Sequence, residues 1–225
     1  MLKRILNATI AGVALIALTV PMLIVALIIK LTLPGPVFFR QKRVGKFGRQ
    51  FEILKFRTMI ADTSHQSAIT VGNDARITPI GSFLRKTKID ELPQLINIVK
   101  GDMNLVGPRP ELPAFVRKYS AADRELVLSV EPGLTDFASI RYRNESELLE
   151  GADNPLDYYE HVLIPRKLRY SRFYIRRAGI RLDFYVIWLT VRSLLGDAFG
   201  KASRARPHSM RGSANSSPHR PIRTL

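Results

Sequence analysis

The chain has 225 residues, of which 35 are Lys or Arg and 19 are Asp or Glu, so its formal net charge is +16. It contains no cysteine, which excludes disulfides, thiolate metal sites and cysteine nucleophiles. A hydrophobic fraction of 46% excludes both a wholly disordered chain and a bundle of many membrane spans. The charge indicates a polyanionic partner: nucleic acid, an anionic membrane surface or a phosphorylated substrate.

The N-terminal segment from Ile5 to Ile29 carries no charged residue. As a helix rising about 1.5 Å per residue, it is long enough to reach across a hydrocarbon core of roughly 30 Å. A cleaved signal peptide fits poorly, because the apolar run is too long and no small-residue cleavage site comes before Lys30. A single transmembrane helix stays open as the alternative.

Two features favour a helix that enters and leaves the membrane on the same side. Pro21 lies well inside the apolar run and predicts a break in the helix. Lys3 and Arg4 precede the run and Lys30 follows it, so the positive-inside rule gives no clear orientation for a spanning helix. We therefore expect residues 1–32 to form a re-entrant membrane-anchoring helix, broken at Pro21, with both ends on the cytoplasmic face.

The middle of the chain predicts a small β-hairpin followed by short helices. Residues 33–36 are a Pro/Gly breaker cluster, and residues 37–57 predict two strands around a basic turn. Residues 61–75 are polar and predict a loop. Helices are predicted over Ser82–Lys88, Asp90–Lys100, Glu111–Val130 and, with a break at Pro165, Tyr158–Leu195.

The C-terminal part contains two basic segments. The segment from Pro165 to Leu182 interleaves Arg and Lys with aromatic residues and has no acid. This pattern is typical of helices in a membrane interface, which we favour; the alternative is a solvated basic face whose aromatic side chains pack on the protein core. Residues 201–225 contain six Lys or Arg and no acid, and their Ser, Pro and Gly content predicts a disordered basic tail.

The densest run of chemically useful residues is 85–111. Asp90 and Glu91 are adjacent acids at the start of a predicted helix, where an isolated pair is more often a helix cap. Arg109 lies between two prolines, which restrict the backbone and so the direction of the guanidinium. Arg85 lies five residues before Asp90. This set suits phosphoryl transfer, because arginines neutralise a diphosphate while a carboxylate binds a metal ion or attacks phosphorus.

Four runs of the chain resemble the signatures of the bacterial sugar transferases, the monotopic polyprenyl-phosphate phosphoglycosyl transferases. The resemblance extends in order from the apolar N-terminus to about Asn144 and is carried by Lys55–Met59, Ile89–Gln94, Lys100–Met103 and Val106–Pro110. It implies transfer of a phosphosugar from a nucleotide-diphosphate sugar to polyprenyl (undecaprenyl) phosphate, with release of a nucleoside monophosphate. Such a reaction is the first membrane step of exopolysaccharide, O-antigen or glycoprotein glycan assembly, at the cytoplasmic face of the bacterial inner membrane.

The resemblance also implies roles for individual residues. Asp90 is similar to the family's nucleophile, which forms a covalent phosphosugar intermediate, and Glu91 is similar to its acidic partner. The family requires Mg²⁺, for which Asp90 and Glu91 are the expected ligands. The expected phosphate-binding residues are Lys55, Arg57, Arg85 and Arg109.

The chain departs from the family pattern in two places. Many members have a Ser–Pro pair at the helix break, whereas Val20 precedes Pro21 here, and we expect Thr19 to hydrogen-bond a carbonyl that the proline frees. Many relatives also have a Gly-Trp-Ala-Gln type of segment where this chain has Asp136–Glu145. The sugar, the nucleotide and the glycan pathway are therefore left open.

The expected fold is α+β and mostly helical. It has a re-entrant membrane helix, a small β-hairpin region and interfacial amphipathic helices around one catalytic domain, residues 33–200. Anionic membrane lipids are expected partners and nucleic acid is not, while a homodimer is left open. A membrane-tethered nucleic-acid-binding protein is the alternative that the charge suggests, but no helix-turn-helix, RNP-like or zinc motif supports it. A structural scaffold leaves Arg109 and the acid pair without a purpose.

Overall fold

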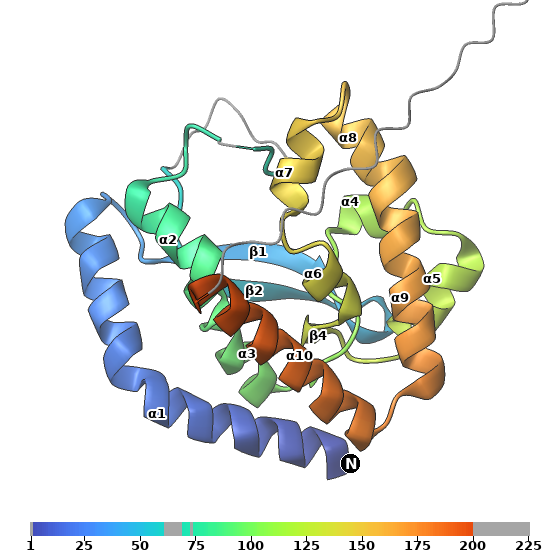
Figure 1. The fold of residues 1–225 in the computed structure, drawn as a ribbon. Coiled ribbons are helices and arrows are strands. Elements are labelled where there is room, and N and C mark those ends of the chain that lie inside the picture. Colours follow the sequence, from blue (N-terminus) through green and yellow to red (C-terminus); the bar gives the residue numbers. More distant parts are fainter. Residues whose placement is uncertain (1, 61–68, 73, 200–225) are drawn as a thin grey trace, which may run out of the picture.

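The protein is described by a computed structural model that covers residues 2–60, 69–72 and 74–199. The described part is mostly helical and contains two small sheets (Figure 1). In chain order the elements are α1 (Leu2–Thr32), β1 (Phe38–Val44), the 3₁₀ turn η1 (Lys46–Gly48), β2 (Gln50–Phe56), α2 (Pro79–Thr87), the 3₁₀ turn η2 (Ile89–Glu91), α3 (Gln94–Lys100), β3 (Asn104–Val106), α4 (Pro113–Val116), α5 (Ala121–Leu128), β4 (Gly133–Thr135), α6 (Phe137–Arg141), α7 (Glu145–Glu150), α8 (Pro155–Tyr158), the π turn η3 (Tyr159–Leu163), α9 (Ile164–Arg177) and α10 (Ile180–Phe199).

The two sheets have different topologies. The predicted hairpin is confirmed: β1 and β2 pair antiparallel, with Phe38 opposite Phe56 and Val44 opposite Gln50. The strands β3 and β4 pair in parallel, which brings the segment after residue 106 next to the Pro132–Thr135 segment. A residue in the left-handed region, Phe47, closes the hairpin turn. The end of β3 packs against α9 and α10, because Val106 lies in one buried cluster with Tyr174 and Val186.

The N-terminal helix α1 is 31 residues long, contains Pro21, and is bent (Figure 1). Its first half packs Ala11 against α3 and β2, and its second half packs Ile29 against Phe56 and Leu84. The face turned away from the domain exposes apolar side chains along its whole length, including Val13, Ile16, Val20, Leu23 and Leu31. Among the described residues, α1 is the helix whose length and composition suffice to cross a membrane.

The expectation for Thr19 is wrong. A proline at position 21 removes the N–H that would bond the carbonyl of Ala17, four residues earlier. The Thr19 hydroxyl instead donates to the carbonyl of Leu15, at 2.7 Å. A threonine hydroxyl in a helix bonds the carbonyl four residues before it, which for Thr19 is Leu15. The carbonyl of Ala17 lies two residues further along the helix, so Thr19 does not bond it.

The aromatic residues of α9 mostly face the protein. Tyr174 is buried, and Tyr170 packs edge-on against Tyr142 at a centroid distance of 6.1 Å. The basic residues Arg166 and Arg169 lie on the outer face of the helix. Tyr170 and Tyr174 therefore pack on the protein, while the medium that surrounds the basic outer face stays a prediction. Phe173 of α9 is exposed, and so are three aromatic side chains of α10, Phe184, Tyr185 and Trp188.

Three predicted helices have different boundaries. The predicted helix from Asp90 is a 3₁₀ turn followed by α3, because Pro93 is the N-cap residue of α3. The predicted helix over residues 111–130 is divided into α4 and α5, because the Ser120 side chain caps the N-terminus of α5. Pro165 lies in the first turn of α9, where a proline is tolerated, and the break comes at residues 178–179 instead. Residues 61–68 of the predicted loop and the predicted tail from Lys201 lie outside the described residues.

Candidate active site

The six charged residues predicted for the site all line one cavity of about 1000 Å³. Its lining residues come from the hairpin and η2, from the segment after β3, and from α6, α9 and α10. The predicted residues on its wall are Lys55, Arg57, Arg85, Asp90, Glu91 and Arg109. Lys55 and Arg109, which are 54 positions apart in the chain, therefore line the same cavity.

The acid pair owes its position to the turn η2. Lys88 adopts a left-handed conformation, with φ 61°, and ends α2, so the chain reverses before it enters η2. Pro93 then begins α3, which leaves Asp90 and Glu91 on a single tight turn. Both carboxylates are buried, with 7% and 8% of their surface exposed. Burying two adjacent acids is costly unless they are paired or protonated.

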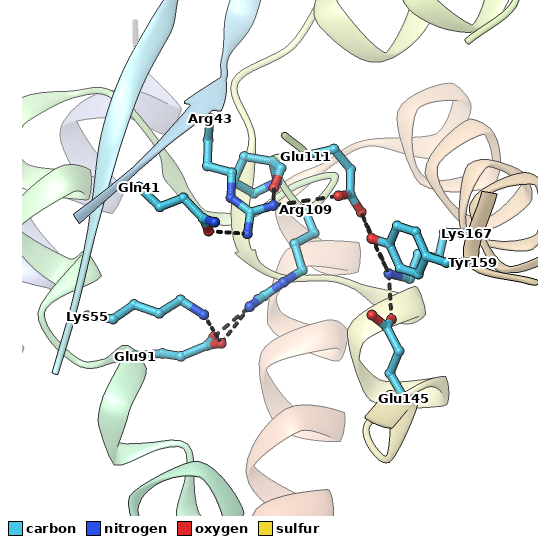
Figure 2. Close-up of polar contacts among 10 residues, drawn as sticks. Gln41, Arg43, Lys55, Glu91, Arg109, Glu111, Glu145, Tyr159 and Lys167 are labelled. Carbon is cyan, nitrogen blue, oxygen red and sulfur yellow. Dashed lines mark hydrogen bonds and ion pairs between the residues drawn. The ribbon is translucent and has the colours of Figure 1, made fainter. Parts of the chain in front are cut away.

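Glu91 is held by two cations (Figure 2). Arg109 donates Nη1 to Oε2 at 3.1 Å and Nη2 to Oε1 at 2.5 Å, a bidentate arrangement, and Lys55 Nζ lies 2.9 Å from Oε1. Burial opposes ionisation, but the charges of Arg109 and Lys55 outweigh it and hold the pKa of Glu91 well below its usual range. The same pairing raises the pKa of Arg109. Glu91 is therefore a fixed negative charge.

Asp90 lies in the opposite situation. Its Oδ1 is buried and has no hydrogen-bond partner among the described residues. Burial raises the pKa of Asp90, and the attraction of Lys55 only partly offsets this shift. A buried carboxylate with few partners contributes little to the stability of the fold. Because little of its charge is neutralised, it is suited to act as a nucleophile or a metal ligand.

The segment that carries Arg109 is fixed by close backbone contact. A Cβ atom at Gly133 would overlap the backbone N of Gly107, and one at Gly107 would lie 2.7 Å from the carbonyl O of Glu131. Gly133 N also donates to the carbonyl of Pro108 at 2.9 Å. Glycines at both positions let the two segments touch, so the backbone that precedes Arg109 has little freedom.

Arg57 and Arg85 line the cavity but do not join the ion pairs around Glu91. Arg57 Nη2 donates to the carbonyls of Leu33, at 3.0 Å, and Pro34, at 2.8 Å, at the end of α1. Arg85 Nη1 lies 3.7 Å from Met59 Sδ. Arg57 thus connects the segment that follows α1 to the end of β2, a role that the sequence did not indicate.

A second polar cluster on the cavity wall could not be predicted from the sequence (Figure 2). Glu111 accepts a hydrogen bond from the Tyr159 hydroxyl at 2.9 Å, and its other oxygen lies 3.5 Å from Arg43 Nη1. Lys167 reaches Glu111 at 3.6 Å and Glu145 at 2.5 Å. Burial raises the pKa of Tyr159 well above its usual range, so its hydroxyl remains a donor.

The sequence position of one member of that cluster, Glu111, could have indicated that it lies at the site. Glu111 follows the Arg109–Pro110 pair directly, and Arg43 donates to the Pro110 carbonyl at 3.2 Å. The remaining members come from α7, η3 and α9, whose relative placement depends on tertiary packing. Nothing in the spacing of Glu145, Tyr159 and Lys167 distinguishes them from ordinary surface residues.

The donor set bears on whether Mg²⁺ fits. No group of three or more Asp, Glu or His side chains that could hold a metal ion occurs among the described residues. Mg²⁺ is usually held by one or two carboxylates together with water and substrate phosphates, so such a group is not required. The unpartnered Oδ1 of Asp90 suits this mode, whereas both oxygens of Glu91 already pair with cations.

Comparison with known proteins agrees with this chemistry. The sequence profile described as "Bacterial sugar transferase" matches residues 1–197. The chain is 36% identical over 199 residues to UDP-glucose:undecaprenyl-phosphate glucose-1-phosphate transferase of Xanthomonas campestris pv. campestris, covering 86% of this chain and 39% of that protein. It is 36% identical over 200 residues to UDP-N-acetylgalactosamine-undecaprenyl-phosphate N-acetylgalactosaminephosphotransferase of Aeromonas hydrophila, covering 86% of this chain and 44% of that protein.

A further relative is matched over more of its length. The UDP-glucose:undecaprenyl-phosphate glucose-1-phosphate transferase of Caulobacter vibrioides is 39% identical over 198 residues, which cover 86% of this chain and 69% of that protein. The chain spans less than half the length of the Xanthomonas and Aeromonas relatives. Since the family profile covers most of the chain, including α1 and the whole cavity, the chain belongs to the bacterial sugar transferase family.

Proposed function

We propose that this protein transfers a phosphosugar from a nucleotide-diphosphate sugar to undecaprenyl phosphate, through a covalent intermediate on Asp90. The observation that carries the proposal is the buried Oδ1 of Asp90, which has no hydrogen-bond partner among the described residues and lies near the charge of Lys55, in the cavity that Arg109 also lines. The relatives are named for UDP-sugars and undecaprenyl phosphate, which supports the same substrate classes here.

The first step is a displacement at phosphorus. A carboxylate oxygen of Asp90 attacks the phosphorus that bears the sugar, and a new oxygen–phosphorus bond forms. The bond from that phosphorus to the bridging oxygen of the diphosphate breaks, and the bridging oxygen leaves with the nucleoside monophosphate. Lys55 and Arg109 lie where they can neutralise the charge that develops on the phosphate oxygens.

The second step returns the enzyme to its starting state. A phosphate oxygen of undecaprenyl phosphate attacks the same phosphorus, and the bond to Asp90 breaks. The products are the undecaprenyl diphosphate sugar and the free carboxylate. Glu91 fixes Arg109 and Lys55 throughout, because its own low pKa keeps it ionised while the charge on the phosphates changes.

Mg²⁺ fits this site as a substrate-linked ion. We propose that Asp90 would hold the ion, because its Oδ1 has no hydrogen-bond partner among the described residues, whereas both oxygens of Glu91 bind cations. When bound, Mg²⁺ neutralises phosphate charge and polarises phosphoryl oxygens. Lys55 and Arg109 supply the positive charge of the site beside Glu91.

The membrane proposal rests on where the two ends of α1 lie. Lys3 Nζ pairs with Asp183 of α10 at 2.8 Å, and the carbonyls of Leu33 and Pro34 accept from Arg57. A straight helix of 31 residues is about 45 Å long and would place these ends on opposite sides of a membrane. Contacts from both ends to one domain support a re-entrant helix with the domain on the cytoplasmic face. The exposed aromatic residues of α10 are proposed to lie in the same interface.

The activity is tested with purified protein in detergent or nanodiscs, a labelled UDP-sugar, undecaprenyl phosphate and Mg²⁺. We expect label in the organic phase and equimolar nucleoside monophosphate in the aqueous phase. Asp90→Asn should abolish both, while Asp153→Asn, a change of the same kind at an exposed residue outside the cavity lining, should leave both intact. Hydrolysis of the sugar nucleotide without transfer to the lipid, or transfer by Asp90→Asn, would contradict the proposal.

A further inference from the structure

The short strand β3 leads directly to the proposed phosphate-binding arginine. It ends at Val106, three residues before Arg109. The N–H of Asn104 donates to the Pro132 carbonyl beside β4, at 2.8 Å. Backbone N–H groups of successive strand residues point to opposite edges of the strand. The N–H of Leu105 therefore points away from β4 and needs a partner outside the sheet.

That partner comes from the membrane helix. Asn7 is buried in the second turn of α1, and its Oδ1 accepts a hydrogen bond from the Leu105 N–H at 2.7 Å. Its Nδ2 donates to the carbonyl of Lys3, also at 2.7 Å, which fixes the orientation of the amide. A buried asparagine in an otherwise apolar helix is therefore satisfied at both ends by backbone groups.

A second contact links the N-terminal end of α1, through Tyr174, to the carbonyl of Val106 in β3. Tyr174 is buried, and its hydroxyl lies 3.0 Å from the Val106 carbonyl and 2.6 Å from Asp183 Oδ1. Lys3 Nζ completes the cluster at 2.8 Å from both the Tyr174 hydroxyl and Asp183 Oδ2. The N-terminal end of α1 lies beside the start of α10, as this cluster requires (Figure 1).

We propose that the first two turns of α1 position Arg109, with Asn7 and the cluster of Lys3, Tyr174 and Asp183 as the positioning residues. They hold the N–H of Leu105 and the carbonyl of Val106, and the Gly107–Gly133 contact carries that constraint to the arginine. The N-terminus of the anchor is thus a part of the active-site framework in addition to a membrane attachment. This inference rests on the phosphate-binding role proposed for Arg109.

The first test replaces Asn7 with Leu, which has a similar size and leaves the Leu105 N–H without an acceptor. Thr9→Leu is the matched control, because Thr9 is an exposed polar residue on the same helix. We expect Asn7→Leu to lower kcat about 10-fold, since small displacements of a catalytic group have effects of this order or larger. Both variants should stay in the membrane fraction, and Thr9→Leu should keep the wild-type kcat.

A purely structural role is distinguished by a double-mutant cycle with Arg109→Lys. If Asn7 acts through Arg109, Asn7→Leu causes little further loss in the Arg109→Lys background. If the two losses multiply, or if Asn7→Leu retains the wild-type kcat, the inference is overturned. Amide hydrogen exchange at Leu105, which we expect to accelerate only in Asn7→Leu, reports on the contact without requiring activity.

A second pair of variants covers the case in which Asn7→Leu does not fold. Lys3→Met removes the ion pair to Asp183, whereas Arg4→Met removes one charge from the neighbouring residue, which forms no ion pair among the described residues. We expect kcat to fall in Lys3→Met, to be restored by Lys3→Arg, and to be unchanged in Arg4→Met. Equal losses in Lys3→Met and Arg4→Met would contradict the inference. A wild-type protein that transfers no phosphosugar would instead refute the proposed function, and hydrogen exchange at Leu105 would then still decide the structural claim.

Discussion

Asp90 and Glu91 are adjacent in the chain, but their carboxylates have opposite surroundings. Glu91 binds Lys55 and Arg109, and its pKa is lowered. Asp90 has a buried oxygen with no hydrogen-bond partner in the described part of the chain, and burial raises its pKa. One turn therefore supplies a permanent anion that fixes two cations and a second carboxylate that stays reactive. Separation of two acids in this way is typical of sites that assign them different roles.

The raised pKa of Asp90 predicts an acid limb in the pH profile. Attack on phosphorus requires the ionised carboxylate, so the rate of nucleoside monophosphate release should fall as the pH drops through the pKa of Asp90. Because that pKa is raised, the fall should begin above the value of about 3.9 for an unperturbed Asp. Glu91 does not contribute, since its pKa is lowered. A single-turnover rate that stays constant down to pH 4 would contradict the assignment.

The two acids should also affect stability in opposite directions. A carboxyl with a raised pKa in the folded state binds a proton more tightly there than in the unfolded chain. Its ionisation above that pKa therefore costs stability. Asp90→Asn removes this cost, and its Tm at neutral pH should equal or exceed that of the wild type.

Glu91→Gln should be destabilising, because it leaves Lys55 and Arg109 buried without their anion. Breaking a buried pair typically costs about 3–5 kcal/mol. The lowered pKa of Glu91 means that its stabilisation is present above the unfolded-state pKa and is lost as the pH falls through the folded-state pKa. Thermal unfolding of both variants at neutral pH checks the two signs, and a lower Tm for Asp90→Asn than for Glu91→Gln would contradict this account.

The contact between Gly107 and Gly133 predicts a steric effect far from the carboxylates. Gly133→Ala would push the added methyl group into the Gly107 backbone and displace the Arg109 segment. Overpacking of this kind costs about 1–3 kcal/mol, and we expect a loss of activity beyond the loss of folded protein. Gly151→Ala is the control, because its nearest neighbour would be 3.9 Å away. Equal stability and activity in the two variants would show that the contact is not restrictive.

The second polar cluster predicts that Lys167 connects the two sides of the cavity. Lys167→Met leaves Glu111 and Glu145 without a shared cation, and we expect a stability loss of about 3 kcal/mol together with a higher KM for the sugar nucleotide. Arg169→Met, on the exposed face of the same helix, should change neither value by much. Denaturant unfolding and initial rates measure the two effects, and identical behaviour of both variants would remove Lys167 from the site.

Much of the site could be predicted from local sequence, because its central residues lie in short, unusual runs. Asp90–Glu91 and the proline-flanked Arg109 stand out without any structure, and the hairpin that carries Lys55 follows from alternation between turn residues. The contacts of Arg57 with the end of α1 could not be predicted, because they depend on how α1 lies against the domain. The cluster of Glu111, Tyr159 and Lys167 was missed for the same reason.

Helix boundaries were less predictable than the site. Apolar spacing indicated a continuous helix over residues 111–130, but the Ser120 cap competes locally and divides it. The aromatic residues of α9 suggested a membrane-facing surface, yet Tyr174 is buried and bonds to β3. Periodicity shows which residues share a face, whereas the partner of that face is decided by tertiary packing.

The most direct test of the central claim is the mass of the protein after reaction with the sugar nucleotide and Mg²⁺ in the absence of undecaprenyl phosphate. We predict a stoichiometric release of nucleoside monophosphate and a mass increase equal to one phosphosugar, located by peptide mapping on Asp90. Addition of undecaprenyl phosphate should remove this mass. Unmodified protein under conditions where the complete reaction proceeds, or a phosphosugar on any other residue, would contradict the account.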